Sequence, residues 1–268
     1  MNQKPSPTLA DSSNAAILED RQREILKLLA MSGSVKVGEL SRRFAVSEVT
    51  IRTDLERLAR QGSLVRFRGG AVAKVDTSQS TAFSERVRNR QAEKERIARK
   101  AIEYVQPGDA LFLDAGSTVL EFAKLLGTCV PLTIVTTAVN TAALLASVPG
   151  IHVIMAGGSL TPETISTVGQ IAERDISDLL GDKVFLGVHS FCPELGIVDV
   201  SVEVARVKNA MIRAARQVIV LADSSKYQTR TLARVAPITA VNMLITDIGL
   251  SDEATDSIVA QGVDVVRV

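Results

Sequence analysis

The pattern of apolar positions along the chain changes near Pro107. Before this point, apolar residues recur every three or four positions. Ile51, Leu55 and Leu58 form one such stripe, and residues 20–32 carry another. This spacing is typical of amphipathic helices. After Pro107, short uninterrupted aliphatic runs alternate with helical segments, which is typical of a parallel sheet buried on both faces.

The first region has the outline of a small DNA-binding domain. The spacing predicts helices over 20–32, 37–44 and from Ser47 to Leu58, with Ser47 as the N-cap of the third. Two short strands are predicted around the Gly69-Gly70 pair. Two helices joined by a tight turn and followed by a two-stranded wing are typical of a winged helix-turn-helix. We assign this domain to residues 17–74.

The third helix carries polar residues that its apolar stripe does not use. In a helix-turn-helix the second helix enters the major groove with its N-terminal turns against the bases. Arg52 can contact guanine or phosphate, Glu48 can accept from cytosine, and wing arginines can contact phosphates. The alternative is a solvated face on a scaffold that binds protein. The predicted DNA-binding residues are Ser47, Glu48, Thr50, Arg52, Thr53, Arg57, Arg66 and Arg68.

The charge distribution supports an anionic partner for the first domain. The net charge of +1 conceals an asymmetry: residues 17–74 hold 12 Lys/Arg and 7 Asp/Glu, whereas residues 75–268 hold 18 and 22. A basic small domain attached to a mildly acidic large one suggests that a polyanion binds the first.

Three further features limit the class of protein. The two cysteines, Cys129 and Cys192, are far apart and have no CxxC spacing, which is typical of reduced thiols. Residues 1–16 lack the layout of a signal peptide, and no apolar run is long enough to cross a membrane. We expect a cytoplasmic protein with no membrane partner, a disordered tail over 1–16 and a linker over 75–90.

Residues 91–268 are predicted to form a mostly parallel, Rossmann-like α/β domain that begins with a helix over 91–105. The aliphatic runs that predict its strands are 110–116, 132–138, 151–158, 183–189, 217–223, 243–247 and 263–268. Ligands of such sheets bind at the carboxyl ends of the strands. Gly116 followed by Ser117 and Thr118 offers close backbone approach, hydroxyls and a helix N-terminus to a phosphate, although a plain turn with an N-cap serine fits nearly as well. The other polar strand-end residues include Asp114, Thr136, Gly157, Gly158, His189, Asp223 and Lys226.

The motifs of both domains resemble the DeoR-type family of bacterial sugar-operon regulators. In the first domain, the VS-x-x-TIR-x-DL core and the L-x-R-x-x-GGA segment carry the resemblance. In the second, FLDAGSTV, FLGV and LADSSKY carry it. The resemblance implies a transcriptional regulator, a repressor of a carbohydrate catabolic operon, with an effector domain related in fold to ribose-5-phosphate isomerase. The implied partners are a double-stranded DNA operator, a phosphorylated sugar effector and further copies of the chain in a homodimer or larger homo-oligomer.

The resemblance also implies roles for particular residues. Gly116, Ser117 and Thr118 would hold the phosphate, while Glu85, Arg86 and Lys94 would complete the site from beside the linker. The residues implied around the sugar are Asp114, Gly157, Gly158, Glu203, Asp223 and Lys226. The chain departs from the family pattern at several positions. Thr53 replaces a usual Arg or Lys, Val119 removes a hydroxyl, and His189 replaces a carboxylate. After the second strand, Thr136-Thr137-Ala138 replaces the usual TNS and loses an amide, although Asn140 lies one helical turn on.

Two other functions remain open from the sequence. One is a sugar-phosphate isomerase or deaminase with an accessory DNA-binding segment, whose general base would be Asp114, Glu203 or Asp223. The other is a protein-binding adaptor. His189 and Cys192 have His-x-x-Cys spacing without a second pair, so we expect no metal, no cofactor and no catalytic residue. Glu203 and Lys208, five apart on a predicted helix, could face the pocket or solvent.

Overall fold

The computed structural model describes residues 21–26, 28–29, 34–60, 64–67, 69–73, 83–229 and 231–268. The chain divides into two compact units, Met1–Val75 and Asp76–Val268. Among the described residues, no helix is both long enough and apolar enough to cross a membrane.

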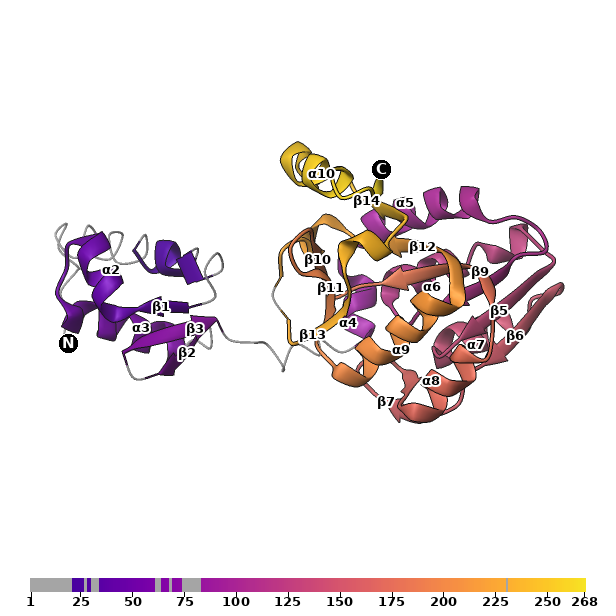
Figure 1. Ribbon diagram of the computed structural model, residues 1–268, viewed down its shortest axis with the longest axis horizontal. Coiled ribbons are helices and arrows are strands. Elements are labelled where there is room, and N and C mark those ends of the chain that lie inside the picture. The colour runs from indigo at the N-terminus through magenta and orange to yellow at the C-terminus, as the bar shows by residue number, and fades with distance from the viewer. Residues whose placement is uncertain are drawn as a thin grey trace, which may run out of the picture. The chain divides into compact units, whose positions relative to one another are not determined.

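The first unit is a winged helix-turn-helix. Residues 21–26 and 28–29 are helical. They are followed by β1 (Ser34–Lys36), α2 (Val37–Phe44), α3 (Glu48–Arg60), β2 (Leu64–Phe67) and β3 (Gly70–Ala73) (Figure 1). The strands form an antiparallel sheet in the order β1-β3-β2. The wing therefore has a third strand, β1, which the sequence pattern did not predict because three residues are too few to show alternation.

The core of this unit is aliphatic and fixes the orientation of α3. Its fully buried members are Ile25, Leu29, Val35, Val37, Leu40, Ile51, Leu55, Leu58, Leu64 and Ala71. On the same face of α3, Asp54 is 2% exposed and accepts hydrogen bonds from Arg21 Nε at 2.6 Å and Gln22 Nε2 at 3.4 Å. A buried carboxylate is stable only when it is paired in this way. Asp54 therefore ties α3 to the first helix.

The second unit is built on a seven-stranded parallel sheet, as the sequence predicted. Its order is β15-β14-β12-β9-β4-β5-β6. The strands are β4 (Ala110–Leu113), β5 (Leu132–Thr136), β6 (Ile151–Met155), β9 (Gly181–Gly187), β12 (Ala215–Leu221), β14 (Met243–Thr246) and β15 (Asp264–Arg267). Each of the seven aliphatic runs overlaps one strand, because strands covered on both faces need no polar alternation.

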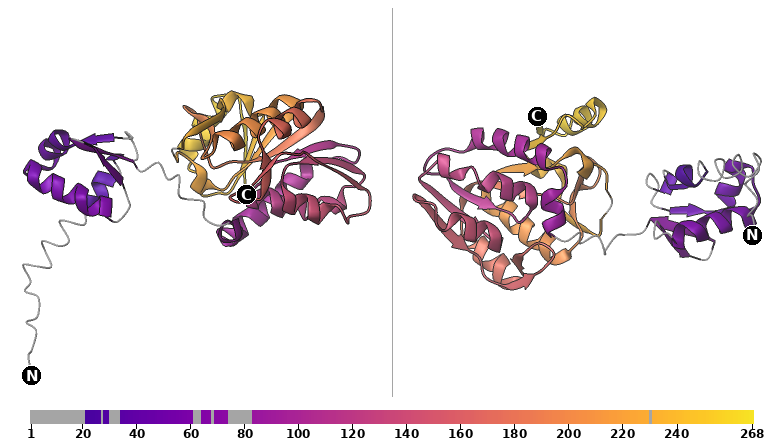
Figure 2. Two further views of the ribbon diagram at one scale, coloured as in Figure 1. Left: turned by 90° about the horizontal axis from the view of Figure 1, so that it is seen from below. Right: turned by 180° about the vertical axis from the view of Figure 1, so that it is seen from behind.

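Helices cover both faces of the sheet (Figure 2). One face packs against α5 (Gln91–Ala101), α6 (Ser117–Ala123) and α7 (Val139–Leu145). The other packs against α8 (Gln170–Ser177), α9 (Val202–Ala214) and α10 (Asp252–Val259). Alternate residues of β4 serve the two faces: Leu111 and Leu113 point into the first core, and Phe112 points into the second. The result is a three-layer α/β sandwich.

Several short elements were not predicted. The α4 helix (Phe83–Arg88) lies inside the segment expected as a linker, and the helix expected over 91–105 becomes 3-10 over Ile102–Tyr104. A hairpin joins β7 (Ser159–Thr161) to β8 (Ser166–Val168). A small antiparallel sheet contains β10 (Ser190–Cys192), β11 (Gly196–Asp199) and β13 (Ala233–Ala236). Strands of three or four residues are too short to give a periodic signal.

Candidate functional site

A cavity in the second unit lies where the strand connections diverge. From β4 the chain passes through α6 to β5, and from β9 it returns through α9 to β12, on the opposite face of the sheet. The carboxyl ends of two neighbouring strands that lead away in opposite directions form a crevice, which is the usual ligand site of an open α/β sheet. A cavity of about 620 Å³ occupies this position. Its volume suits a small metabolite.

Seven of the predicted effector-binding residues line this cavity. They come from the β4–α6 turn, from the end of β9, from the start of α9 and from the turn after β12. They are Gly116, Ser117, Thr118, His189, Glu203, Asp223 and Lys226. Arg86 and Lys94, which the resemblance placed beside the site, also line it.

Two predicted residues after β5 lie outside the cavity lining. The Thr136 hydroxyl is fully buried, donates to Leu113 O at 2.7 Å and accepts from Ala138 N at 3.0 Å. The Asn140 side chain accepts from Thr141 N at 2.9 Å, at the start of α7. Strand β5 lies on the side of β4 away from β9, so its carboxyl end does not face the crevice. We assign a structural role to the Thr136 hydroxyl, whereas Asn140 Nδ2 is buried without a partner.

Gly157 and Gly158 also lie outside the lining, but they shape a segment that reaches it. Gly158 has φ +127°, and a Cβ there would lie 2.5 Å from Val168 O. Only glycine fits such a backbone conformation without strain. The turn leads from β6 into the β7–β8 hairpin, which contributes Thr161, Glu163 and Thr164 to the cavity. The sequence pattern missed these three residues because they lie in a hairpin rather than at a strand end of the main sheet.

A buried ion network borders the cavity. Lys208 Nζ donates to Asp199 Oδ2 at 2.7 Å and to Gly187 O at 2.7 Å, and it lies 3.2 Å from Asp114 Oδ2. Asp114 Oδ2 also accepts from Gly187 N at 3.1 Å. Lys208 and Asp199 line the cavity, whereas Asp114 does not. The network joins the ends of β4, β9 and β11 through α9.

Burial and charge together set the protonation of this network. Burial raises the pKa of Asp114 to about 6, although the attraction of Lys208 opposes the rise. Burial alone would lower the pKa of Lys208, but Asp114 and Asp199 raise it to about 12. Burial would raise the pKa of Asp199, yet Lys208 lowers it below its ordinary value. At neutral pH the network therefore contains a charged lysine between two carboxylates.

His189 enters the same cavity from the end of β9. Burial lowers the pKa of its imidazole, Asp199 opposes this, and Lys226, Lys208 and Arg86 reinforce it. A pKa below the ordinary value of 6.5 leaves the ring neutral at pH 7. A neutral imidazole offers one hydrogen-bond donor and one acceptor, which suits a hydroxyl group.

The cationic side chains that line the cavity include Arg86, Lys94 and Lys226. Lys94 is 4% exposed, and its ammonium group donates to the carbonyls of Arg86 and Asn89. Burial lowers the pKa of Lys94, Asp223 opposes this, and the nearby Lys226 and Arg86 lower it further. Lys226 forms no ion pair with any described residue. Arg86 Nη2 donates to the carbonyl of Glu163, while its Nε is buried without a partner. Such a cluster is stabilised by a bound anion.

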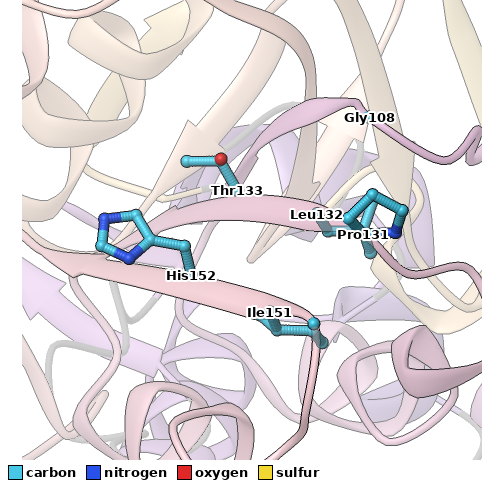
Figure 3. Close-up of a pocket in the computed structure, with 7 residues that line it drawn as sticks. Gly108, Pro131, Leu132, Thr133, Ile151 and His152 are labelled. Atoms are coloured by element: carbon cyan, nitrogen blue, oxygen red, sulfur yellow. The ribbon is translucent and has the colours of Figure 1, made fainter.

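A second cavity, of about 410 Å³, lies at the opposite ends of the strands (Figure 3). Thr133 of β5 and His152 of β6 lie side by side there, next to Pro131 and Ile151. Its lining contains no Asp, Glu, Lys or Arg side chain. Within the described part of the chain, no three His, Cys, Asp or Glu side chains are grouped as metal ligands would be. The cavity at the strand carboxyl ends is therefore the candidate small-molecule site.

In the first unit, the N-terminal turns of α3 present the predicted DNA-binding face. Ser47 caps the helix by accepting from Thr50 N at 3.1 Å, and Arg52 Nη2 lies 2.7 Å from Glu48 Oε2. The Thr53 hydroxyl donates to Val49 O at 3.0 Å. Ser47, Glu48, Arg52, Thr53, Arg57 and Arg66 are exposed, Thr50 is half-buried, and Arg68 lies outside the described residues.

Comparison with known proteins identifies the family of both units. Residues 21–77 match the DeoR-like helix-turn-helix domain, and residues 89–248 match the DeoR C-terminal sensor domain. The chain is 36% identical over 252 residues to the uncharacterized HTH-type transcriptional regulator YulB of Bacillus subtilis, covering 94% of this chain and 97% of that protein. It is 33% identical to the glycerol-3-phosphate regulon repressor of Escherichia coli K12, covering 85% and 90% of the two chains.

Solved structures resemble only part of the chain. Ribose 5-phosphate isomerase A of Methanocaldococcus jannaschii aligns with 51% of this chain and 54% of its own, at a TM-score of 0.38 and 16% identity. The family assignment depends on the sequence matches, which cover both units. The chain belongs to the DeoR family of helix-turn-helix transcriptional regulators.

Proposed function

We propose that this protein is a transcriptional repressor of a carbohydrate catabolic operon, and that a phosphorylated sugar in the 620 Å³ cavity controls its affinity for operator DNA. One observation carries the proposal: the cavity has hydroxyls and unneutralised cations at one part of its lining and a buried carboxylate–lysine network at another. The first set suits a phosphate, and the second suits a polyhydroxylated carbon chain.

The phosphate would lie against the β4–α6 turn. Ser117 and Thr118 supply hydroxyl donors there, and the first backbone N–H groups of α6 have no acceptor within the helix. Lys94 and Lys226, which both line the cavity, supply positive charge. Hydrogen bonds between charged groups of this kind are about twice as strong as neutral ones.

The sugar would extend toward His189, Asp199 and Glu203. Neutral His189 and ionised Asp199 can both accept hydrogen bonds from hydroxyls, and His189 can also donate one. Asp199 is held in place by Lys208 at 2.7 Å. A site built to bond hydroxyls rejects analogues that lack them, because its own polar groups are then left unpaired. This part of the cavity would select the sugar.

The proposed function is that of a regulator rather than of an isomerase or deaminase. Catalysis of either reaction needs a general base with a tuned pKa facing the ligand. Asp114 has a raised pKa of about 6 but lies outside the cavity lining, bonded to Lys208 and Gly187 N. Asp223 lines the cavity but accepts hydrogen bonds from Ser225. Glu203 also lines the cavity but is exposed to solvent. The membership of both units in a regulator family supports the same conclusion.

The DNA-binding unit would act in pairs. Helix-turn-helix dimers bind two half-sites about one DNA turn apart, and each half-site takes one recognition helix. Two copies of the chain are therefore needed to fill both half-sites. We therefore include a homodimer or larger homo-oligomer in the proposal. For a 100-fold change in operator affinity, the ligand must distinguish the DNA-competent from the incompetent arrangement by about 2.7 kcal/mol.

A ligand screen tests the function directly. The full-length protein is heated with a panel of phosphorylated sugars and, in parallel, with their unphosphorylated forms. A ligand at 100 times its Kd should stabilise the folded state by about 2.7 kcal/mol, which gives a shift in Tm of a few degrees. The variant Lys226→Ala should lose the shift, whereas Lys100→Ala, on α5 and outside the cavity lining, should retain it. Catalytic turnover of the stabilising sugar phosphate would reject the regulator assignment in favour of the enzyme.

A further inference from the structure

The N-terminal turn of α3 exposes one apolar side chain. Val49 is 68% exposed, and it lies in the first turn of a helix whose buried residues are Ile51, Asp54, Leu55 and Leu58. At about 100° per residue, Val49 points away from the centre of that buried stripe. It contributes nothing to the core. A β-branched residue at this position also has a lower helix propensity than most alternatives.

The polar side chains around Val49 are already bonded to one another. Glu48 pairs with Arg52 at 2.7 Å, and the Ser47 and Thr50 hydroxyls lie 2.9 Å apart. The Thr53 hydroxyl donates to the carbonyl of Val49 itself. These contacts order the polar groups along the edges of the exposed face. The Val49 side chain lies between these polar groups on the helix surface, and its isopropyl group can neither donate nor accept a hydrogen bond.

The major groove of DNA offers one apolar group to such a side chain. Each base edge there presents hydrogen-bond donors or acceptors, and thymine alone adds a C5-methyl group. The N-terminal turns of the second helix of a helix-turn-helix are the part that contacts base edges. Glu48 and Arg52, paired beside Val49, match the cytosine amino group and the guanine acceptors. The three side chains together present donor, acceptor and apolar chemistry in adjacent positions.

We propose that Val49 is a specificity-determining residue that contacts the methyl group of a thymine in each operator half-site. The inference rests on the proposed function, since it requires that α3 enters the major groove. Among the described residues of the recognition helix, Val49 is the exposed large apolar side chain. Its contact is chemically distinct from the hydrogen bonds expected of Arg52 and Glu48.

The experiment removes the two partners of this contact separately. Binding sites are first selected from a pool of random DNA duplexes with the full-length protein. Each thymine of the selected site is then replaced by deoxyuridine, which lacks only the methyl group. Affinities of the wild type and Val49→Ala are measured by fluorescence anisotropy at one fixed salt concentration. Because Val49 is exposed and outside the core, Val49→Ala should fold, and its melting curve should match that of the wild type.

In each half-site, one thymine position should be sensitive to replacement. Each deoxyuridine at that position should lower the affinity of the wild type about fourfold, which corresponds to about 0.8 kcal/mol for a buried methyl group. Val49→Ala should lose clearly less affinity at the deoxyuridine sites, because its single methyl group makes a smaller contact with the thymine methyl. A matched control, Glu56→Ala, removes an exposed side chain two turns further along α3 and should keep the wild-type response to deoxyuridine.

Two negative results have different meanings. If the selected site binds the wild type tightly but Val49→Ala responds to every deoxyuridine as the wild type does, the thymine contact is refuted and the proposed function stands. If the selection enriches no sequence at all, operator recognition by α3 is refuted, and the inference falls with the proposed function.

Discussion

The buried Lys208 network makes a strong prediction about stability. In Lys208→Met the side chain keeps its approximate shape and loses its charge. The substitution leaves two carboxylates, Asp114 at 2% exposure and Asp199 at 5% exposure, without their shared cation. Removing one partner of a buried ion pair typically costs about 3–5 kcal/mol, because the remaining charge is uncompensated. We expect a loss of this size at pH 7.5.

The loss should shrink in acid. In the wild type, the pKa of Asp114 in the folded protein is about 6, above the ordinary value of 3.8. The folded state therefore binds this proton more tightly than the unfolded state, so the contribution of Asp114 to stability decreases as pH rises from about 4 to 6. Without the attraction of Lys208, the pKa of Asp114 rises further. Each additional unit adds about 1.4 kcal/mol to the loss at pH 7.5 and nothing at pH 5.

Urea denaturation followed by tyrosine fluorescence reports the unfolding of the second unit, which contains the Lys208 network. The chain has no Trp and two Tyr, Tyr104 and Tyr227, and both lie in the second unit. The free energy of unfolding is compared for the wild type and Lys208→Met at pH 5 and 7.5. The double variant Lys208→Met/Asp199→Asn supplies the control, because neutralising one carboxylate should recover part of the loss at pH 7.5.

Two results would refute this account of the network. The first is an equal loss for Lys208→Met at both pH values. The second is a double variant no more stable than Lys208→Met at pH 7.5. Either would mean that the variant is destabilised by lost packing rather than by unpaired charge.

The structure supports three further predictions. Lys226→Ala should weaken the binding of a phosphorylated sugar about 10- to 100-fold, measured by calorimetry, because a charge-assisted hydrogen bond contributes about 1.5–3 kcal/mol. Binding of the unphosphorylated sugar should not change. Equal losses for both forms would contradict the proposed phosphate position. Asp54→Ala should accelerate amide hydrogen exchange throughout the first unit but not the second, because it leaves Arg21 largely buried without its partner. Gly158→Ala should lower the Tm more than Gly169→Ala, since both have positive φ but only Gly158 would also clash with a strand carbonyl.

The main sheet could be predicted from sequence because its strands share one physical condition. Strands covered by helices on both faces need no polar positions, so the buried halves of β9 and β12 appear in the sequence as continuous apolar runs. The antiparallel strands around the cavity do not meet this condition. β10 contains only Ser190–Cys192, and β11 contains four residues. Their pairing depends on contacts with β13, which is distant in sequence.

The cavity residues could be predicted only as far as strand ends identify them. The rule that ligands bind at carboxyl ends selected Ser117, His189 and Lys226, all of which line the cavity. It also selected Thr136, whose hydroxyl is used within the fold. The rule cannot separate these cases without the order of strands, because only the ends nearest the β4–β9 divergence form the crevice.

The residues that hold the cavity in shape are harder to predict from the sequence than those that line it, and Lys208 is an example. Its sequence neighbourhood is an ordinary amphipathic helix, and its five-residue spacing from Glu203 left open whether the side chain faces the pocket or solvent. The actual partners, Asp114 and Asp199, come from different sheets, and a buried lysine stays charged only when such partners surround it. Since Asp199 both lines the cavity and anchors Lys208, a ligand that bonds Asp199 would act on the ends of β4 and β9 through the same lysine. Under the proposed function, the network would therefore couple binding of the sugar phosphate to the packing of the sheet, which strand ends alone would not do.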